Sequence, residues 1–182
     1  MEYNFFTVIE GNDIETYNLD DKAKWSIGRP SKGNVPDIKL HSITVSRKHG
    51  LLYNSDGLWM YRDGYGKNGT IYNEVKVKKT INRAGDEIED PIILDNGDTF
   101  IFGGADVPVL DSKTVFALYT DDIKKPDWRT IDTANMDKLT FVNGTEEKVL
   151  NDSKKGDVLR IKNSIAIYMG DVTYITGDMQ LK

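Results

Sequence analysis

The chain has 182 residues, 38% of them hydrophobic, and a formal net charge of −5, which exclude an intrinsically disordered protein and argue against broad binding to nucleic acid. It contains no cysteine, which excludes a disulfide framework and a thiolate metal site. No apolar run approaches the ~20 residues that a membrane-spanning helix needs, and the first residues lack the pattern of a signal peptide. These features predict a cytoplasmic location with no membrane insertion of this segment.

Basic residues are concentrated in one part of this acidic chain. Residues 24–48 contain six basic side chains and one acidic side chain, a formal charge of +5. A small basic zone on an acidic protein favours a local site for one anion over an extended track for a polyanion. Uneven charge is also common on solvated faces, so the zone by itself does not decide between the two explanations.

The predicted elements are short strands separated by Gly, Asn and Asp turns. No window shows a helical period with caps at both ends. Many short strands with frequent turns predict an all-β sandwich or barrel with an aromatic core. The predicted strands cover residues 3–10, 24–28, 49–54, 58–63, 69–73, 75–80, 98–104 and 114–120, followed by 138–144, 157–161, 164–170 and 171–177. The aromatic residues expected in the core are Trp25, Trp59, Phe100, Phe102 and Phe116.

A charged, proline-containing stretch interrupts the strand rhythm after Thr120. We therefore predict one domain over residues 1–120 and a second unit over residues 121–182, which is small for an independent core. The second unit repeats a pattern of the first, in which Asn-Gly-Thr is followed later by Gly-Asp. This repeat predicts an incomplete copy that packs on the first domain or follows it, although Asn-Gly-Thr is also a common hairpin turn. The two copies of the pattern lie at 68–70 with 97–98 and at 143–145 with 156–157.

Three short pieces carry most of the candidate chemistry. They are WSIGRPSKGNVPDIKL at 25–40, VSRKHG at 45–50 and GYGKNGTIYN at 64–73, and LDNGD at 94–98 follows them before the Phe-Gly pair at 102–103. The motifs Gly-Arg, Ser-Arg-x-His, Asn-Gly-Thr and Gly-Asp, in this order and spacing, resemble the forkhead-associated (FHA) domain. Any one of these motifs would carry no information, whereas the ordered set is specific.

The resemblance implies an FHA-type eleven-stranded β-sandwich followed by a smaller, degenerate FHA-like β unit. The implied function is a bacterial signalling module that binds phosphothreonine in a partner protein through loops at one end of the sandwich, with no catalysis, cofactor or metal ion. The implied partner is a phosphothreonine-containing protein or peptide, namely a Ser/Thr kinase or its substrate. A phosphothreonine carries roughly −1.5 to −2 charges and three acceptor oxygens, so its site needs several strong donors.

By resemblance, these donors come from the motifs themselves. Arg29 would supply a charged donor to the phosphate and Ser46 a hydroxyl donor. The neighbouring Arg47 would contact the phosphate or the ligand backbone. Lys67 stands where the family often has Ser or Thr, so it would contribute its ammonium group or only its backbone N–H. Asn68 would bond the main chain of the ligand and fix it beside the phosphate.

Further motif residues are expected to support the site. His49 would lie under the loops and bond neighbouring backbone groups, and Asn73 would tie two loops together. Thr44 lies where family members often touch the residue three places after the phosphothreonine. The supporting residues are Gly28, His49, Gly69, Thr70 and Asn73.

A hydrolase with a Ser46/His49 pair is a weaker alternative. No Gly-x-Ser-x-Gly elbow surrounds Ser46. Residues three apart along a strand face opposite ways, so this pair would be poorly placed as nucleophile and base. A metal site is also disfavoured, since the chain has two histidines, no cysteine and acids scattered in turns.

The stronger alternative is an FHA fold that serves as a docking platform without phosphate. The stretch 156–178 is similar to the end of the FHA-like modules at the N-terminus of the membrane ATPase of bacterial type VII secretion, some of which bind partners without phosphate. In that case this chain would be the cytosolic part of a larger membrane-associated protein. The intact Gly-Arg, Ser-Arg and Asn-Gly-Thr motifs favour the phosphate-dependent function.

Overall fold

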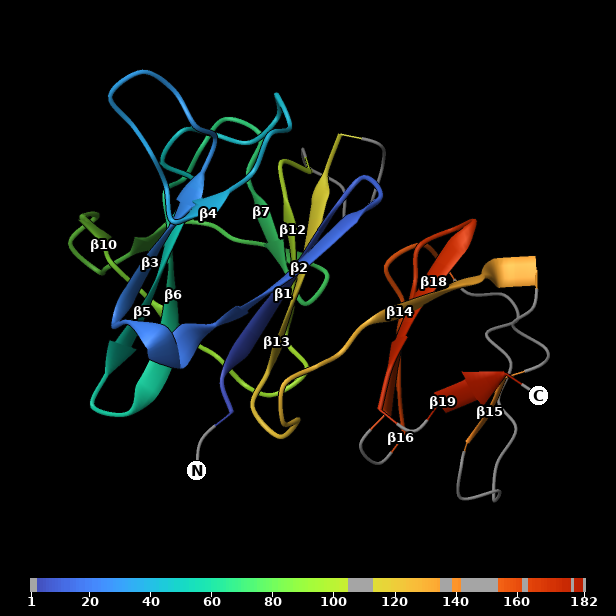
Figure 1. The fold of residues 1–182 in the computed structure, drawn as a ribbon. Helices are drawn as coiled ribbons and strands as arrows, with labels where there is room; N and C mark the ends of the chain where they lie inside the picture. Colours follow the sequence, from blue (N-terminus) through green and yellow to red (C-terminus); the bar gives the residue numbers. More distant parts are fainter. Residues whose placement is uncertain are drawn as a thin grey trace. The chain divides into compact units, whose positions relative to one another are not determined.

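The computed structural model describes residues 3–104, 113–134, 139–141, 154–161, 164–177 and 179–181. The chain divides into two units, Met1–Asp122 and Ile123–Lys182 (Figure 1). Strands dominate both units, which confirms the predicted all-β class. No helix in the described part of the chain is long and apolar enough to cross a membrane.

The first unit contains two large sheets that together hold eleven strands, the number implied by the resemblance. One sheet has six strands in the order β2-β1-β13-β12-β7-β8, and the other has five in the order β11-β6-β5-β3-β4. A separate hairpin pairs β9 with β10. The strands of the first unit are β1 (Phe5–Glu10), β2 (Asp13–Asn18), β3 (Lys24–Gly28), β4 (Ile38–Lys39), β5 (Gly50–Ser55), β6 (Leu58–Asp63), β7 (Thr70–Tyr72), β8 (Val75–Lys76), β9 (Thr80–Ile81), β10 (Glu87–Ile88), β11 (Ile92–Ile93), β12 (Thr99–Phe102) and β13 (Val115–Thr120).

The core lies between the two large sheets. Along β6, burial alternates so that Trp59, Tyr61 and Asp63 face inward, as expected of a strand with one face against a core. One buried cluster joins side chains of both sheets, among them Phe6 and Phe100 from the six-stranded sheet. The five aromatic residues expected in the core are all buried: Trp25, Trp59, Phe100, Phe102 and Phe116.

Short strands account for most differences from the sequence-based prediction. The stretch 75–80 was expected as one strand but forms β8 and the start of β9. Between them, Val77 donates its backbone N–H to the Thr70 carbonyl at 2.9 Å. β2 was not predicted, because its largely polar sequence alternates only weakly. Its pairing with β1 is what makes it a strand. Such edge strands are held by tertiary pairing more than by pattern.

The second unit has a four-stranded sheet in the order β14-β18-β17-β16 and a two-stranded pair of β15 and β19. The Gly156-Asp157 pair precedes β16 directly, as in the predicted repeat, but the Asn-Gly-Thr at 143–145 lies outside the described residues. The interpretation of this unit as an incomplete FHA-like copy therefore stays a prediction. Its strands are β14 (Arg129–Asp132), β15 (Leu139–Phe141), β16 (Val158–Ile161), β17 (Ser164–Tyr168), β18 (Val172–Thr176) and β19 (Met179–Leu181).

Candidate functional site

Strand register brings three loops to one end of the five-stranded sheet. Ile27 at the end of β3 pairs with Gly50 at the start of β5, and Gly50 pairs with Asp63 at the end of β6. β4 runs parallel to β3, with Lys39 opposite Gly28. The β3–β4 loop (29–37), the β4–β5 loop (40–49) and the β6–β7 loop (64–69) therefore start or end at the same edge of the sandwich (Figure 1).

Hydrogen bonds join the β3–β4 loop to the β4–β5 loop. Arg29 donates its backbone N–H to the Ser46 carbonyl at 3.0 Å, and its side-chain Nε to the Val45 carbonyl at 3.1 Å. Asn34, which the sequence interpretation did not include, donates its side-chain amide to the Arg47 carbonyl at 2.8 Å. These bonds fix the Arg29 side chain beside the segment that carries Ser46.

The β6–β7 loop joins the same cluster through Asn68. Its side-chain Nδ2 donates to the Thr44 carbonyl at 3.0 Å, so the amide group is directed toward the β4–β5 loop. Its Oδ1 accepts no hydrogen bond from the described residues. The carboxamide therefore retains an acceptor for an N–H group of a ligand main chain.

Three cationic side chains on these loops have no ion-pair partner among the described residues. Arg29 is half-buried, and its Nε donates to the Val45 carbonyl. Its two terminal nitrogens donate no hydrogen bond to any of the described residues. Arg47 and Lys67 are exposed. A guanidinium with two unused terminal nitrogens can donate a pair of parallel hydrogen bonds to a phosphate.

Two close contacts explain why glycine occupies positions 28 and 66. A Cβ atom on Gly28 would lie 1.9 Å from the Arg47 carbonyl oxygen, and one on Gly66 would lie 2.0 Å from the Ser46 hydroxyl oxygen. The φ angle of Gly28 is not positive, so glycine is needed there because it has no side chain and not because of its backbone conformation. Gly66 was not predicted as a site residue, although its place beside the Ser46 hydroxyl makes it part of the site.

The substitution Gly66→Ala is expected to disturb the Ser46 hydroxyl directly, since the new methyl group would occupy its position. If this hydroxyl binds an anion, phosphopeptide affinity should fall about tenfold, the value of one charge-assisted hydrogen bond. Titration calorimetry measures this loss. A second Gly→Ala change such as Gly57→Ala would not be a suitable control, because the positive φ of Gly57 (+84°) would strain an alanine there. The matched control is Ala84→Gly in an exposed turn, which should leave affinity unchanged. Unchanged affinity in Gly66→Ala would remove Ser46 from the site.

His49 lies at the centre of the three loops and is buried. Its backbone N–H donates to the Ile27 carbonyl at 2.9 Å, and its carbonyl accepts from the Gly64 N–H at 2.8 Å. Its ring nitrogen Nδ1 accepts the backbone N–H of Ser46 at 3.1 Å. Because a backbone N–H can only donate, Nδ1 carries no proton and the neutral ring holds its proton on Nε2.

The Nε2 side of the ring continues a buried network. Nε2 lies 2.9 Å from the Thr70 hydroxyl and 3.1 Å from the Gly69 carbonyl. Thr70 in turn donates to the Asp63 carboxylate at 2.5 Å, and Tyr61 donates to the same carboxylate at 2.6 Å. Asp63 and Tyr61 were not predicted as site residues, because in the sequence both are ordinary strand residues.

Burial lowers the pKa of His49 below its ordinary value, since a buried site disfavours the imidazolium ion; the Asp63 carboxylate and the Gly69 carbonyl oppose this effect without reversing it. The unfolded chain then takes up a proton below about pH 6.5 that the folded chain does not. We expect the free energy of unfolding contributed by His49 to be complete above that pH and to decrease as the pH falls below it.

Urea denaturation at pH 7.5 and 5.5 measures this pH dependence. The wild type should lose more stability between the two pH values than His49→Asn does, because the variant lacks the titrating ring. His41→Asn, which replaces the exposed histidine, should behave as the wild type does. Equal losses in the wild type and His49→Asn would show that His49 does not govern this part of the pH profile.

The remaining predicted residues lie near these loops but differ in what they contact. The Thr44 hydroxyl donates to the Lys113 carbonyl at 2.8 Å, so it is engaged by the protein's own backbone. Gly69 has φ of +70°, a conformation that favours glycine. Asn73 joins the β7–β8 turn to β12, since its Nδ2 donates to the Asp98 carboxylate at 3.0 Å and its Oδ1 accepts the Thr99 N–H at 2.9 Å.

The geometry between Ser46 and His49 differs from that of a nucleophile and its base. The ring nitrogen nearest Ser46 bonds its backbone N–H and not its hydroxyl. The pair was expected to have the geometry of a strand, but residues 43–48 lie in the irregular β4–β5 loop. Among the described residues, no group of three or more His, Cys, Asp or Glu side chains could hold a metal ion.

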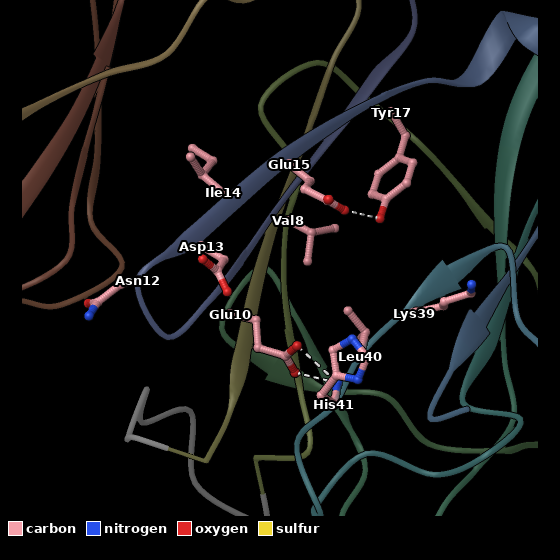
Figure 2. Close-up of a pocket in the computed structure, with 10 residues that line it drawn as sticks. All are labelled: Val8, Glu10, Asn12, Asp13, Ile14, Glu15, Tyr17, Lys39, Leu40 and His41. Carbon is pink, nitrogen blue, oxygen red and sulfur yellow. Dashed lines mark hydrogen bonds between the residues drawn. The ribbon is translucent and has the colours of Figure 1, made fainter. Parts of the chain in front are cut away.

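A polar pocket of about 290 Å³ lies beside the start of the β4–β5 loop (Figure 2). Glu10 at its edge accepts backbone N–H groups of the loop, from His41 at 2.7 Å and from Ser42 at 2.9 Å. On the opposite side of the pocket, Tyr17 donates to Glu15 at 2.5 Å. The carboxylate of Glu10 thus fixes the end of the β4–β5 loop that is remote from Arg47.

Comparisons with known proteins agree with the motif analysis. The family model of the FHA domain matches residues 25–103. Among solved structures, the first FHA domain of Rv1747 from Mycobacterium tuberculosis is 17% identical, with 65% of this chain and 98% of that chain covered and a TM-score of 0.42. The FHA domain of CT664 from Chlamydia trachomatis is 21% identical, with 65% and 97% covered and a TM-score of 0.44.

Full-length yeast Pml1p is 19% identical, with 66% of this chain and 82% of that chain covered and a TM-score of 0.48. The comparison with curated proteins found no match. All the predicted site residues, from Gly28 to Asn73, fall within the range of the family match. The match over residues 25–103 thus confirms that this part of the chain is an FHA domain.

Proposed function

We propose that the chain binds phosphothreonine-containing segments of partner proteins reversibly, through Arg29, Ser46 and Asn68. FHA domains are phosphothreonine-dependent interaction modules and not enzymes, and residues 25–103 match that family. The observation that carries the proposal is the convergence of the three loops, in which Arg29 and Asn68 both bond the segment 44–46. A guanidinium, a hydroxyl and a carboxamide then surround one doubly charged group.

Each member of this set has a separate role in the proposal. Arg29 gives its two terminal nitrogens to the phosphate, and Ser46 gives its hydroxyl. Arg47 and Lys67 add positive charge from exposed positions. Asn68 accepts a main-chain N–H of the ligand through Oδ1. A few charge-assisted hydrogen bonds of roughly 1.5–3 kcal/mol each support micromolar affinity after the cost of ordering the ligand.

The proposed partner is a Ser/Thr kinase or one of its substrates. One similar solved structure belongs to work on phosphothreonine-dependent FHA domain interactions, and another is an FhaA FHA domain in complex with the intracellular domain of Rv3910. Those interactions belong to those proteins, and we propose the same class of partner for this chain. The role of residues 156–178 in a secretion-type assembly stays a prediction.

Titration calorimetry tests the proposal. The chain is titrated with a degenerate phosphothreonine peptide library and with the same library without phosphate. We expect heat of binding from the phosphorylated library alone. Equal binding of the two libraries would contradict the proposal and favour a docking platform that does not depend on phosphate.

A further inference from the structure

Two exposed β-branched side chains lie on the loops that carry the proposed phosphate site. Val35 in the β3–β4 loop is 73% exposed and Ile43 in the β4–β5 loop is 76% exposed. No other large hydrophobic residue in the described part of the chain is as exposed as these two. Neither contributes to the core. Single exposed apolar residues are common on protein surfaces, so their position must carry any further conclusion.

Ile43 is adjacent in the chain to one of the bonds that assemble the site. The next residue, Thr44, accepts the side-chain amide of Asn68 through its carbonyl. The hydroxyl of Thr44 donates to the Lys113 carbonyl, and the preceding Ser42 donates its hydroxyl to that same carbonyl and its N–H to Glu10. The polar groups of both chain neighbours are thus engaged by the protein itself, and the exposed Ile43 side chain is next in the chain to the residue that Asn68 bonds.

Val35 is adjacent in the chain to a residue that bonds the other end of the segment 44–47. The preceding Asn34 donates its amide to the Arg47 carbonyl at 2.8 Å, and its backbone forms a tight bridge with Ser31, at 3.0 Å in both directions. The loop is therefore fixed where Val35 is exposed. Arg29 and Ser46 lie between these two connections, since the backbone of Arg29 bonds the Ser46 carbonyl.

We infer that Ile43 and Val35 bind apolar side chains of the partner segment on the two sides of its phosphothreonine. This inference rests on the proposed function and specifies its ligand, as a phosphothreonine flanked by aliphatic residues. A ligand main chain that bonds Asn68 passes beside Ile43, and a ligand that continues past Arg29 and Arg47 reaches Val35. Covering these side chains removes apolar surface from water, which favours an aliphatic residue over glycine or an acid at the same position.

Phosphothreonine peptides with one flanking position varied at a time test the inference by titration calorimetry. Each position carries leucine, glycine or aspartate in turn. The wild type should bind the leucine peptide about tenfold more tightly than the glycine peptide at one position on each side, equivalent to about 1.4 kcal/mol. Ile43→Ser should lose the preference on one side only, and Val35→Ser the preference on the other.

Leu58→Ser is the matched control. Leu58 is 51% exposed and begins β6, at the end of that strand opposite to the β6–β7 loop, so both leucine preferences should persist in this variant. Thermal unfolding checks that the three variants are as stable as the wild type. A leucine preference that survives in both Ile43→Ser and Val35→Ser, or a wild type with no leucine preference, would overturn the inference while leaving phosphothreonine binding intact. Failure of the wild type to bind any phosphothreonine peptide would refute the proposed function as well.

Discussion

The variant Arg29→Ala is expected to lose phosphopeptide binding while the chain stays folded. The terminal nitrogens of Arg29 are the charged donors proposed to bind the phosphate, and each lost charge-assisted hydrogen bond costs roughly 1.5–3 kcal/mol. Loss of two such bonds lowers affinity by about a hundredfold or more, which takes micromolar binding out of the measurable range. Calorimetry with the phosphothreonine library measures this change.

The folded state should survive because Arg29 is only half-buried and makes one side-chain bond, from Nε to the Val45 carbonyl. Removing it takes one hydrogen bond from the Val45 carbonyl and leaves the backbone bond from the Arg29 N–H to the Ser46 carbonyl in place. Arg83→Ala is the matched control, since it removes the same charge from an exposed position in the turn between β9 and β10. Binding in Arg29→Ala as tight as in Arg83→Ala would show that the phosphate site is elsewhere.

The variant His49→Ala is expected to reduce the free energy of unfolding by about 3 kcal/mol. The change leaves the buried Ser46 N–H without its acceptor. It also removes one of two partners from the Gly69 carbonyl, which still accepts the Gly103 N–H, and one from the Thr70 hydroxyl, which still donates to Asp63. Each buried polar group left unpaired costs roughly 1–3 kcal/mol, and the lost ring also leaves a void against Phe102, whose ring centroid is 5.3 Å away. Urea denaturation near neutral pH measures the loss.

His49→Asn separates the two sides of the ring. An asparagine carbonyl oxygen can take the place of Nδ1 and accept the Ser46 N–H, while the bonds to Gly69 and Thr70 are lost. This variant should therefore be more stable than His49→Ala and should retain more phosphopeptide affinity at a temperature where both are folded. If the two variants were equally stable and bound equally, the bond from Ser46 to His49 would have no part in shaping the loop.

The strands with strong alternation were predictable, whereas β2 and β4 were not. In β6, inward Trp59 and Tyr61 alternate with outward residues, so the sequence alone indicates the strand. β4 has two residues and β2 is a largely polar edge strand, and both are defined by their pairing with β3 and β1. Pairing between strands distant in the chain depends on register, which local pattern does not contain.

The candidate site shows the same division between local and long-range information. The ordered motifs identified Arg29, Ser46 and Asn68 as candidates from sequence. The motifs did not identify Asn34 or Gly66, because a bond to the Arg47 carbonyl and a close approach of the Ser46 hydroxyl exist only once the loops have met. The bond from the Thr44 hydroxyl to the Lys113 carbonyl likewise joins residues that lie far apart in the chain.

A crystal structure of the chain with its preferred phosphothreonine peptide tests the central claim most directly. We expect a phosphate group within hydrogen-bonding distance, about 2.7–3.0 Å, of the Arg29 guanidinium and the Ser46 hydroxyl, with a peptide N–H bonded to Asn68 Oδ1. A peptide bound to any other surface, or bound at this end of the sandwich with its phosphate in solvent away from Arg29, would contradict it.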